Sequence, residues 1–299
     1  MPAPIGLSSR SADRFGRAIL GWGEDHRRVL PWRETRDPWA VLVSEVMLQQ
    51  TQAPRVVVPF SRFLRAFPTP MACAEAGSAA VVRAWEGLGY NRRARSLHGA
   101  AMAIVERHGG RVPSDRASLE ALPGIGPYTA RAVLVFAFEQ DAAVVDTNVA
   151  RVLARSVAGR PLSARQAQDL ADRLLPSGRS WAYNQSMLDL GAGHCTSRRP
   201  GCAGCPLRRR CVWARAGWPL PDPARSTAGT ARPQARFEGS DRQGRGRLID
   251  TLRRGTVPSF DVARAAGWPE DPGRADRVLG DLIAEGLVRR SPDGSVDLA

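Results

Sequence analysis

The sequence of 299 residues contains no lysine, because all 43 of its basic residues are arginines. A lysine amine is the usual group that forms a Schiff base with a carbonyl substrate. This absence excludes a lysine Schiff-base mechanism and leaves only the amino terminus as a substitute. The sequence also lacks an apolar run of the roughly 18–20 residues that a membrane span needs. Its start lacks the charged and apolar regions of a signal peptide, so we expect a cytoplasmic protein.

Acidic residues are few, and the 29 acids leave a net charge of +14. Such a charge favours a polyanion, above all nucleic acid, as the partner. A coding bias toward high GC content also enriches arginine and alanine, but it explains the excess of base over acid less well. The apolar content of 43% is sufficient for a packed core.

The organisation of the chain changes twice. From residue 11 to about residue 214, apolar residues recur at helical spacing between short breakers, which predicts a succession of helices and an all-α fold. The breakers are Pro31, Pro59, 68–70, 109–110, Pro113, 123–126, 159–161 and 176–178. Residues 216–240 are rich in proline and glycine and are interpreted as a linker. Residues 241–299 predict three helices and a hairpin, the order of a small winged-helix-like module.

Four of the five cysteines lie close together in the basic segment HCTSRRPGCAGCPLRRRC, residues 194–211. In a reducing cytoplasm, Cys195, Cys202, Cys205 and Cys211 point to metal or cluster ligation and not to disulfides. A zinc site usually has two C-x-x-C pairs and this segment has one, whereas an iron–sulfur cluster accepts less regular spacing. The zinc site and the iron–sulfur cluster both stay open at this level. A third alternative is that the four cysteines are buried free thiols without a metal. The fifth cysteine, Cys73, is expected in the core.

The segment LPGIGPYTA, residues 122–130, predicts a tight turn between two helices. Gly124 and Gly126 permit positive φ angles and leave backbone N–H groups uncovered. The helix that starts at Pro127 presents its positive end to the same side. Such a turn can hold a DNA phosphate without a charged side chain, although an ordinary helix connection has the same pattern.

Two acids stand alone in apolar helical surroundings. Glu45 is the only acid between Asp37 and Glu75, and a carboxyl among such neighbours is expected to have a raised pKa, as a proton donor needs. Asp146 stands where an apolar run becomes a helix, at or near the N-cap. The alternatives are a buried glutamate paired with an arginine and a simple capping aspartate. One acid and one carboxylate also suit the cleavage of a glycosidic bond.

Several strings together resemble the A/G-specific adenine DNA glycosylases of the endonuclease III superfamily, which has a helix-hairpin-helix and a Gly/Pro-Asp signature. The matching strings are LPWR (30–33), SEVMLQQTQ (44–52), GLGY (87–90), RARSLH (93–98), LPGIGPYTA, VVDTNVARVLAR (144–155), NQSMLDLG (184–191) and C-x6-C-x2-C-x5-C. The resemblance covers about residues 15–215. It implies a two-lobed fold with a 4Fe–4S cluster on the four cysteines.

The implied domains are an iron–sulfur lobe (1–30 and 146–215) and a six-helix barrel with the helix-hairpin-helix (31–145). They are followed by the linker (216–240) and the winged-helix-like module (241–299). Family members commonly carry a Nudix-like C-terminal domain, for which the last sixty residues are too few, so the chain resembles a short form. Asn91 also departs from the family, in which a second Tyr or a Pro is frequent.

The resemblance also implies roles for single residues. Glu45 would protonate adenine, Asp146 would stabilise the cationic sugar, and Tyr128 and Asn148 would tune both carboxyls. The pocket for the flipped adenine would be lined by Trp32, Arg33, Leu48 and Gln185. The gap in the duplex and the opposite 8-oxoguanine would be contacted by Gln50, Thr51, Leu88 and Tyr90, and the phosphate by Gly124 and Gly126.

The implied activity is removal of adenine mispaired with 8-oxoguanine or guanine in double-stranded DNA, by a monomer associated with the nucleoid. Bifunctional relatives carry a lysine where this chain has Tyr128, so we expect a monofunctional hydrolase that leaves an abasic site. Two alternatives remain: a thymine or uracil mismatch glycosylase of the same superfamily, and a non-catalytic helix-hairpin-helix DNA-binding protein.

Overall fold

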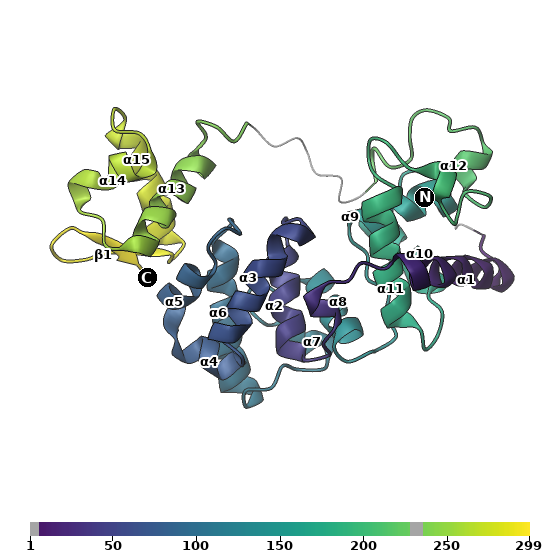
Figure 1. Cartoon of the computed structure of the whole chain (residues 1–299), viewed down its shortest axis with the longest axis horizontal. Coiled ribbons are helices and arrows are strands. Elements are labelled where there is room, and N and C mark those ends of the chain that lie inside the picture. Colours follow the sequence, from purple (N-terminus) through teal and green to yellow (C-terminus); the bar gives the residue numbers. More distant parts are fainter. Residues whose placement is uncertain (1–5, 228–235) are drawn as a thin grey trace. The chain divides into compact units, whose positions relative to one another are not determined.

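The computed structural model describes residues 6–227 and 236–299 and is mostly helical (Figure 1). The helices up to residue 215 are α1 (Ser9–His26), α2 (Pro38–Leu48), α3 (Ala53–Ala66), α4 (Pro70–Glu75), α5 (Gly77–Ala84), α6 (Arg92–His108), α7 (Arg116–Glu120), α8 (Pro127–Phe136), α9 (Thr147–Leu153), α10 (Ala164–Leu174), α11 (Ser180–Asp189) and α12 (Val212–Arg215). Short helical turns are η1 (Pro31–Arg33), η2 (Ala154–Ala158), η3 (Leu190–His194) and η4 (Cys202–Gly204). Residues 6–215 contain no strand, as predicted. None of the helices in the described ranges combines the length and the apolar character that crossing a membrane requires.

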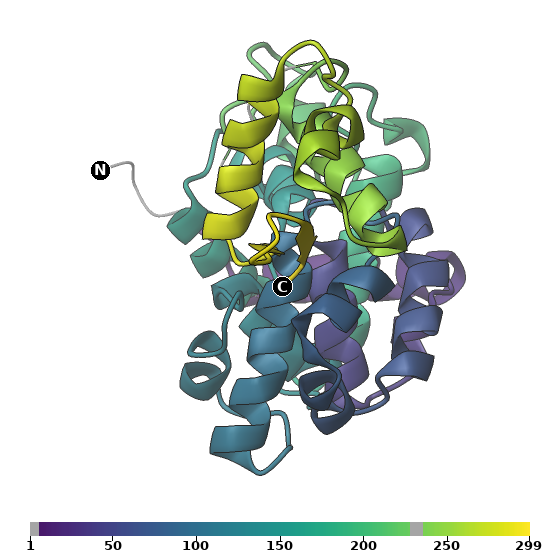
Figure 2. The same ribbon diagram turned by 90° about the vertical axis from the view of Figure 1, so that its left-hand side faces the viewer.

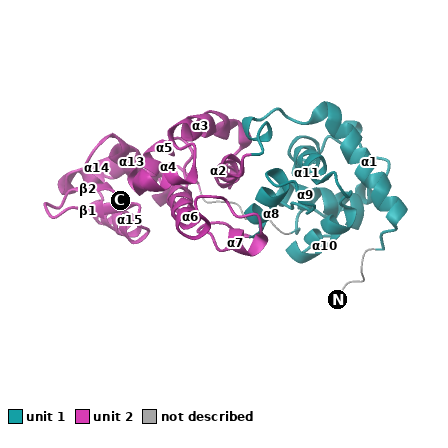
Figure 3. Ribbon diagram, turned by 90° about the horizontal axis from the view of Figure 1, so that it is seen from below, with its two compact units in different colours: residues 1–36, 127–232 teal, residues 37–126, 233–299 magenta. Residues whose placement is uncertain are grey.

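Two compact units divide the chain (Figure 3). Unit 1 consists of residues 1–36 and 127–232, and unit 2 consists of residues 37–126 and 233–299. Each unit is therefore assembled from two segments that are distant in the sequence. The domain boundaries that the sequence suggested, at residues 30 and 145, differ from those of the units, and they stay a prediction.

The core of unit 1 is built from the apolar faces of α1, α9, α10 and α11. Helix α10 illustrates why these segments are helical. Ser163 and Gln166 close its first turn with a reciprocal capping box, and the residues it buries, among them Leu170 and Leu174, recur every three or four positions. Helix α1 packs against α10 and α11. This packing holds the beginning of α9 in place, and the functional residues of unit 1 gather there.

Helix α2 is the central helix of unit 2, because every residue from Trp39 to Met47 is buried. Its first turn is closed by Asp37, whose carboxylate accepts hydrogen bonds from the backbone N–H groups of Trp39 and Ala40. A helix that is apolar all round belongs inside a protein. The polar side chains that α2 does carry, including Glu45, are therefore placed in the interior of unit 2.

Helix α3 corrects one detail of the sequence analysis, since Pro59 was expected to interrupt the helical pattern and lies inside the helix. A proline removes one backbone hydrogen bond and clashes with the preceding turn, which usually ends a helix. Here the buried face formed by Val56, Phe60 and Phe63 continues across the proline at helical spacing. Burial of this face keeps the helix intact.

The C-terminal segment has the predicted order of three helices followed by a hairpin (Figure 2). Its elements are α13 (Asp241–Arg254), η5 (Ser259–Asp261), α14 (Val262–Ala266), α15 (Pro272–Ala284), β1 (Val288–Arg290) and β2 (Val296–Leu298). The strands pair antiparallel, with Val288 opposite Leu298. Gly294, in the Pro-Asp-Gly turn, has a φ of +83°, a conformation that favours glycine. We call residues 241–299 the C-terminal module.

The stretch expected to be a linker is packed against unit 1 over part of its length. The Asp222 carboxylate pairs with the Arg155 guanidinium at 2.5 Å, and the Thr227 hydroxyl accepts a hydrogen bond from the Leu162 N–H at 3.2 Å. Ala224 between them is buried. The proline-rich composition does not distinguish a packed extended segment from a free linker, because both lack helical periodicity. Residues 228–235 of the expected linker lie outside the described residues.

Candidate active site and cysteine loop

Asp146 is the N-cap of α9, as the sequence predicted. Its Oδ1 accepts a hydrogen bond from the Val149 N–H at 2.7 Å, and its Oδ2 accepts one from the Asn148 side-chain amide at 2.6 Å. Burial raises the pKa of Asp146, while the bonds from Val149 and Asn148 act in the opposite direction by stabilising the carboxylate. The carboxylate is thus held in one orientation, with both of its oxygens engaged.

The segment that leads into Asp146 is fixed by Asn184 of α11, a residue that the sequence analysis did not single out. The Asn184 side chain accepts a hydrogen bond from the Val144 N–H at 2.7 Å and donates one to the Ala142 carbonyl at 2.9 Å. Asn184 is buried. A buried carboxamide whose oxygen and nitrogen both bond to one backbone segment holds that segment in position.

Arg151 connects the Asp146 region to the cysteine loop. Its guanidinium donates to Asn148 Oδ1 at 2.8 Å, to the Gly191 carbonyl at 2.7 Å and to the Cys195 carbonyl at 2.6 Å. Burial lowers the pKa of Arg151. The sequence analysis missed this residue, although an arginine one helical turn after Asn148 in an apolar helix was the available signal.

Arg33, predicted to line the base pocket, is buried and forms a two-pronged ion pair with Asp189. Its Nη1 lies 2.7 Å from Asp189 Oδ2, and its Nη2 lies 3.0 Å from Asp189 Oδ1. Burial alone would raise the pKa of Asp189, but the hydrogen bonds and charge of Arg33, together with Arg28, outweigh it and lower the pKa. The charge of Arg33 is therefore neutralised inside unit 1, and Asp189 is a further residue that the sequence analysis missed.

The remaining predicted residues of unit 1 lie on neighbouring elements. Trp32, in η1, is buried, and so is Gln185 of α11. Tyr128, the second residue of α8, is half-buried, and α8 packs against α11. Of the residues predicted for catalysis and the base pocket, unit 1 thus carries Trp32, Arg33, Tyr128, Asp146, Asn148 and Gln185.

Glu45 is buried in α2, with 5% of its surface exposed, as its apolar neighbours predicted. Leu48, at the end of the same helix, is half-buried. Glu45 belongs to unit 2 and Asp146 belongs to unit 1. The pairing of the two carboxyls stays a prediction.

Gln50 and Tyr90 share an uncommon backbone conformation, with φ angles of 56° and 47°. A residue other than glycine is sterically strained when its backbone has a positive φ, and such strain is frequent at functional sites. Gln50 is exposed, and 43% of the Tyr90 surface is exposed. Leu88 is different: it was predicted to contact DNA, but only 2% of its surface is exposed. Its apolar side chain is buried in unit 2, two residues before Tyr90.

A single half-buried guanidinium, that of Arg93, ties the segments around Gln50 and Tyr90 together. It donates to the carbonyls of Val46, Met47 and Gln49 at 2.6–2.9 Å and to the Thr51 hydroxyl at 3.1 Å. It also donates to the carbonyls of Leu88 and Gly89. Burial lowers the pKa of Arg93 to about 10. No sequence pattern points to this role, because the bonded segments are distant along the chain.

The turn before α8 uses a left-handed backbone at Gly124, whose φ is +76°. A Cβ there would lie 2.6 Å from the Ser96 Cβ, so only glycine fits. Gly126 does not have a positive φ, and the space beside its Cα is open. Both glycines are exposed. A positive φ was expected to be possible at both glycines, and the structure uses it at Gly124 but not at Gly126.

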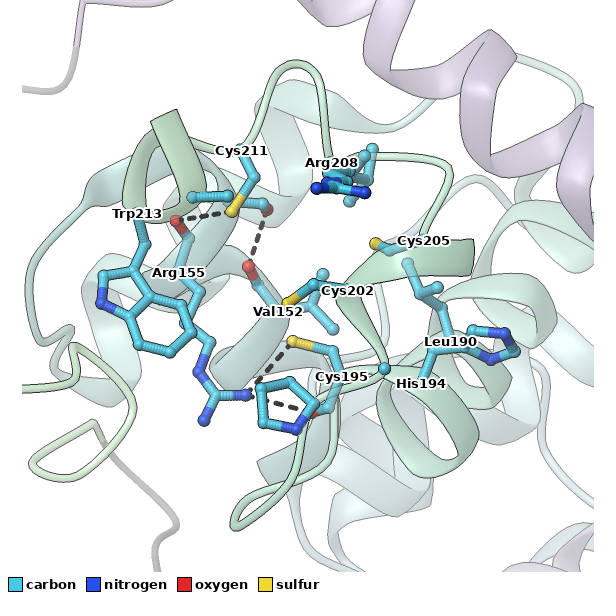
Figure 4. Close-up of a pocket in the computed structure, with 15 residues that line it drawn as sticks. Val152, Arg155, Leu190, His194, Cys195, Cys202, Cys205, Arg208, Cys211 and Trp213 are labelled. Atoms are coloured by element: carbon cyan, nitrogen blue, oxygen red, sulfur yellow. Dashed lines mark hydrogen bonds between the residues drawn. The ribbon is translucent and has the colours of Figure 1, made fainter. Parts of the chain in front are cut away.

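The four cysteines of the loop line one hollow, together with Arg155, His194 and Trp213 (Figure 4). All four are free thiols and half-buried. The Arg155 guanidinium donates to the Cys195 sulfur at 3.4 Å and to the Thr196 carbonyl at 2.7 Å, while the Cys211 thiol donates to the Arg155 carbonyl at 3.3 Å. Arg155 therefore organises both ends of the loop and also binds Asp222.

The donor set suits a metal or a cluster by its chemistry. Burial raises the pKa of the Cys205 thiol to about 11 and raises the pKa of Cys195 and Cys211 as well, so thiolates there need compensating positive charge. Within residues 6–227 and 236–299, no three His, Cys, Asp or Glu side chains converge on an ion-binding point. The four thiols thus line the same hollow, but no three of them meet at a common point. Five exposed arginines surround them: Arg198, Arg199, Arg208, Arg209 and Arg210.

Comparison with known proteins agrees with the resemblance. A family model described as HhH-GPD superfamily base excision DNA repair protein matches residues 43–177. An adenine DNA glycosylase of Mycolicibacterium smegmatis is 43% identical over 286 residues, 94% of this chain and 94% of the relative. A thymine-DNA glycosylase of Aeropyrum pernix is 38% identical over 216 residues, 69% of this chain and 97% of that protein. A solved structure of a thermostable thymine-DNA glycosylase has a TM-score of 0.64 and 29% identity, covering 69% of this chain and 98% of the other.

Proposed function

The chain belongs to the HhH-GPD superfamily of base excision DNA repair proteins, and on this premise we propose that it is an adenine DNA glycosylase. It hydrolyses the N-glycosidic bond of adenine mispaired with 8-oxoguanine or guanine and leaves an abasic site. The observation that carries the proposal is the Asp146 carboxylate, fixed by Val149 and Asn148 at the start of α9. A buried carboxylate of this kind stabilises the positive charge that develops on a sugar when its base departs.

Glu45 is the proton donor in this proposal. It gives its proton to N7 of adenine, the bond between N9 and C1′ breaks, and the bonding electrons leave with the base. A water molecule adds to C1′ and returns a proton to Glu45. Asp146 faces the sugar through this step, and Tyr128 and Asn148 adjust the two carboxyls. The burial of Glu45 supports its part, because a carboxyl shielded from bulk water can meet the base in a closed pocket.

The base pocket takes Trp32, Arg33, Leu48 and Gln185. Trp32 and Gln185 are buried, which suits stacking on a flipped base and hydrogen bonding to its edge. Arg33 contributes through Asp189: since both of its terminal nitrogens bond to that carboxylate, it shapes the pocket wall and does not bring a free charge to the neutral base.

In this proposal, backbone N–H groups and side chains of the protein both bind the DNA. The exposed turn with Gly124 and Gly126 offers N–H groups to a phosphate. Gln50, Thr51 and Tyr90 enter the duplex at the mispair and contact the partner base, and the buried Leu88 supports their loop from beneath. Double-stranded DNA in the nucleoid is the partner, and one monomer is sufficient.

A 4Fe–4S cluster is the cofactor in this proposal, held by Cys195, Cys202, Cys205 and Cys211. When bound, the cluster supplies structure, because its four bonds fold the loop. The chain then presents the exposed arginines of that loop to phosphates. Four thiols around one hollow support this assignment. Iron and sulfide analysis and absorbance near 400 nm test it against zinc.

The C-terminal module is a winged-helix-like DNA-binding element in this proposal. Its support is the order of three helices and a hairpin, together with two exposed arginines, Arg289 and Arg290, on β1. An extended basic strand at the edge of such a module suits contact with the DNA backbone.

Thymine or uracil excision is the second candidate, because thymine-DNA glycosylases also match this chain. That similarity is 38% over 69% of the chain, compared with 43% over 94% for the adenine-specific relative. The longer match leaves only 6% of the chain uncovered, so it includes most of the C-terminal module. The greater coverage by the adenine-specific relative favours adenine over thymine or uracil as the excised base.

A panel of duplexes tests the proposal. Purified protein is incubated with adenine opposite 8-oxoguanine, guanine or cytosine, and with thymine or uracil opposite guanine. Release of adenine from the first two duplexes is the expected result. Release of thymine or uracil alone would replace the proposal by the second candidate, and the absence of any release would leave a DNA-binding protein.

A further inference from the structure

The loop between α5 and α6, residues 85–91, is held by four arginines that come from three different helices. Two of them lie on α3: Arg55 donates to the Gly87 carbonyl at 2.9 Å, and Arg62 donates to the Glu86 carbonyl at 3.2 Å. Arg93 of α6 donates to the carbonyls of Leu88 and Gly89. The fourth, Arg253, comes from α13 of the C-terminal module.

Arg253 reaches out of its own module. Its Nη2 donates to the Asn91 side-chain oxygen at 2.8 Å, and its Nε donates to the Val82 carbonyl at 3.1 Å. Only 8% of the Arg253 side chain is exposed. Val82 lies in the last turn of α5, where the helix dipole favours a cation, and its carbonyl also accepts from the Trp85 N–H at 3.3 Å. The guanidinium pairs with Asp250 of its own helix and takes its two further acceptors from outside its own module.

Asn91 shows that the contact shapes the loop. It is the N-cap of α6, and asparagine usually caps a helix with its own side chain. Here the backbone of Asn91 is already in the right-handed helical region and its side chain makes no capping hydrogen bond. The side-chain oxygen accepts from Arg253 instead. Asn91 directly follows Tyr90, whose backbone has a positive φ and whose side chain is exposed. The bond from the C-terminal module is therefore one residue away from the strained, exposed tyrosine.

Two further contacts place the module against the same part of unit 2. Strand β2 lies beside α5. The Arg95 guanidinium of α6 packs on Gly286, where a Cβ would come within 2.7 Å of Arg95 Nε. Arg253 therefore belongs to an interface, and it is the member of that interface that touches the Tyr90 loop.

We propose that Arg253 is a positioning residue through which the C-terminal module holds the Tyr90 loop for contact with the base opposite the adenine. The proposal rests on the function proposed above and deepens it. It assigns the module a part in the choice of mispair, because Tyr90 reads the partner base from a conformation that Arg253 and Asn91 maintain. Loss of the bond relaxes the loop and weakens the preference between partner bases more than it slows adenine release.

The test is a double-mutant cycle in the full chain with Arg253→Ala, Asn91→Ala and the double variant. Arg254→Ala is the matched control, because Arg254 is the neighbouring arginine on α13, is exposed, and carries the same charge. Two quantities are measured: amide hydrogen exchange of residues 85–91, and the ratio of single-turnover rates on adenine opposite 8-oxoguanine and opposite guanine.

Both single variants are expected to speed exchange in the loop and to lower the rate ratio by about tenfold, as loss of a hydrogen bond to a charged group predicts. The double variant should be no worse than either single one, and Arg254→Ala should match the wild type. A merely structural role would lower the thermal midpoint and slow both duplexes equally, which overturns the proposal, as do additive effects or an unchanged ratio. A wild-type chain that releases no adenine overturns the proposed function and the claim about the partner base, while loop exchange still decides whether Arg253 supports the loop.

Discussion

The side-chain amide of Asn148 donates a hydrogen bond of 2.6 Å to the Asp146 carboxylate. The orientation of this amide is not free, because its oxygen accepts a hydrogen bond of 2.8 Å from Arg151. An amide bonded through its oxygen on one side presents its N–H groups on the other. Arg151 therefore directs a donor toward the carboxylate, and Arg151 in turn is anchored to the Cys195 carbonyl.

The relationship between Asn148 and Asp146 predicts a shift in pH dependence. Burial raises the pKa of Asp146, and the Asn148 bond opposes that rise. The reaction needs the carboxylate, so activity falls as pH falls through this pKa. Asn148→Ala removes one stabilising donor and should move the acid limb of the rate profile to higher pH. Single-turnover rates of adenine release across the acidic range measure the shift, with Asp169→Asn, an exposed acid on α10, as the control. An acid limb at the wild-type position would contradict the role given to Asn148.

Glu45→Gln should slow adenine release by about a hundredfold to ten-thousandfold, the usual contribution of a positioned proton donor. Glutamine keeps the size of the side chain and removes the proton, so the fold should be retained. The single-turnover rate at saturating enzyme is measured together with the circular dichroism of the variant. If the rate stays within a factor of two or three of the wild type, roughly the scatter expected of a change away from the chemistry, Glu45 is not the acid.

Arg155→Met should destabilise unit 1 and impair loading of the cysteine loop. The substitution leaves the half-buried Asp222 carboxylate without its cation, and breaking such an ion pair costs up to about 3–5 kcal/mol, the range for fully buried pairs. It also removes the donors to Cys195 and Thr196. Chemical denaturation gives the free energy of unfolding, and the iron content per chain gives the loading. Arg165→Met, a solvent-exposed change on α10, is the control and should alter neither value. Normal iron content and stability in Arg155→Met would show that Arg155 does not organise the loop.

The absence of lysine predicts that the protein releases the base without cutting the strand. Borohydride reduces a Schiff base to a stable amine, so an enzyme that attacks the sugar with an amine becomes covalently attached to its DNA. Incubation with a labelled adenine mispair and borohydride should yield no adduct in good amount, while a lysine-bearing endonuclease III yields one under the same conditions. A strong adduct would identify the amino-terminal amine as a nucleophile.

The residues that the sequence located best are those whose neighbours in the chain define their surroundings. The burial of Glu45 followed from the apolar residues around it in α2. The capping position of Asp146 followed from the change from an apolar run to a helical pattern at the start of α9. Both properties are local, and local pattern carries them.

The residues that the sequence did not reveal work through partners that are far away in the chain. Asp189 pairs with Arg33 across 156 positions, and Arg93 bonds to Met47 across 46. Arg253 reaches Asn91 across 162. An arginine that serves a distant carbonyl has no pattern of its own, because the surrounding helix would tolerate it as an ordinary exposed residue. The packing of residues 222–227 escaped notice for the same reason, since Asp222 depends on Arg155.

The most direct measurement of the central claim is adenine release by Asp146→Asn. Asparagine keeps the shape of the side chain and its ability to cap α9, but it lacks the negative charge that we propose to face the sugar. The account predicts that the single-turnover rate on adenine opposite 8-oxoguanine falls by at least about a hundredfold, while the affinity for the same duplex in a gel-shift measurement stays near that of Asp169→Asn and the wild type. Release of adenine by Asp146→Asn at the wild-type rate would contradict the account.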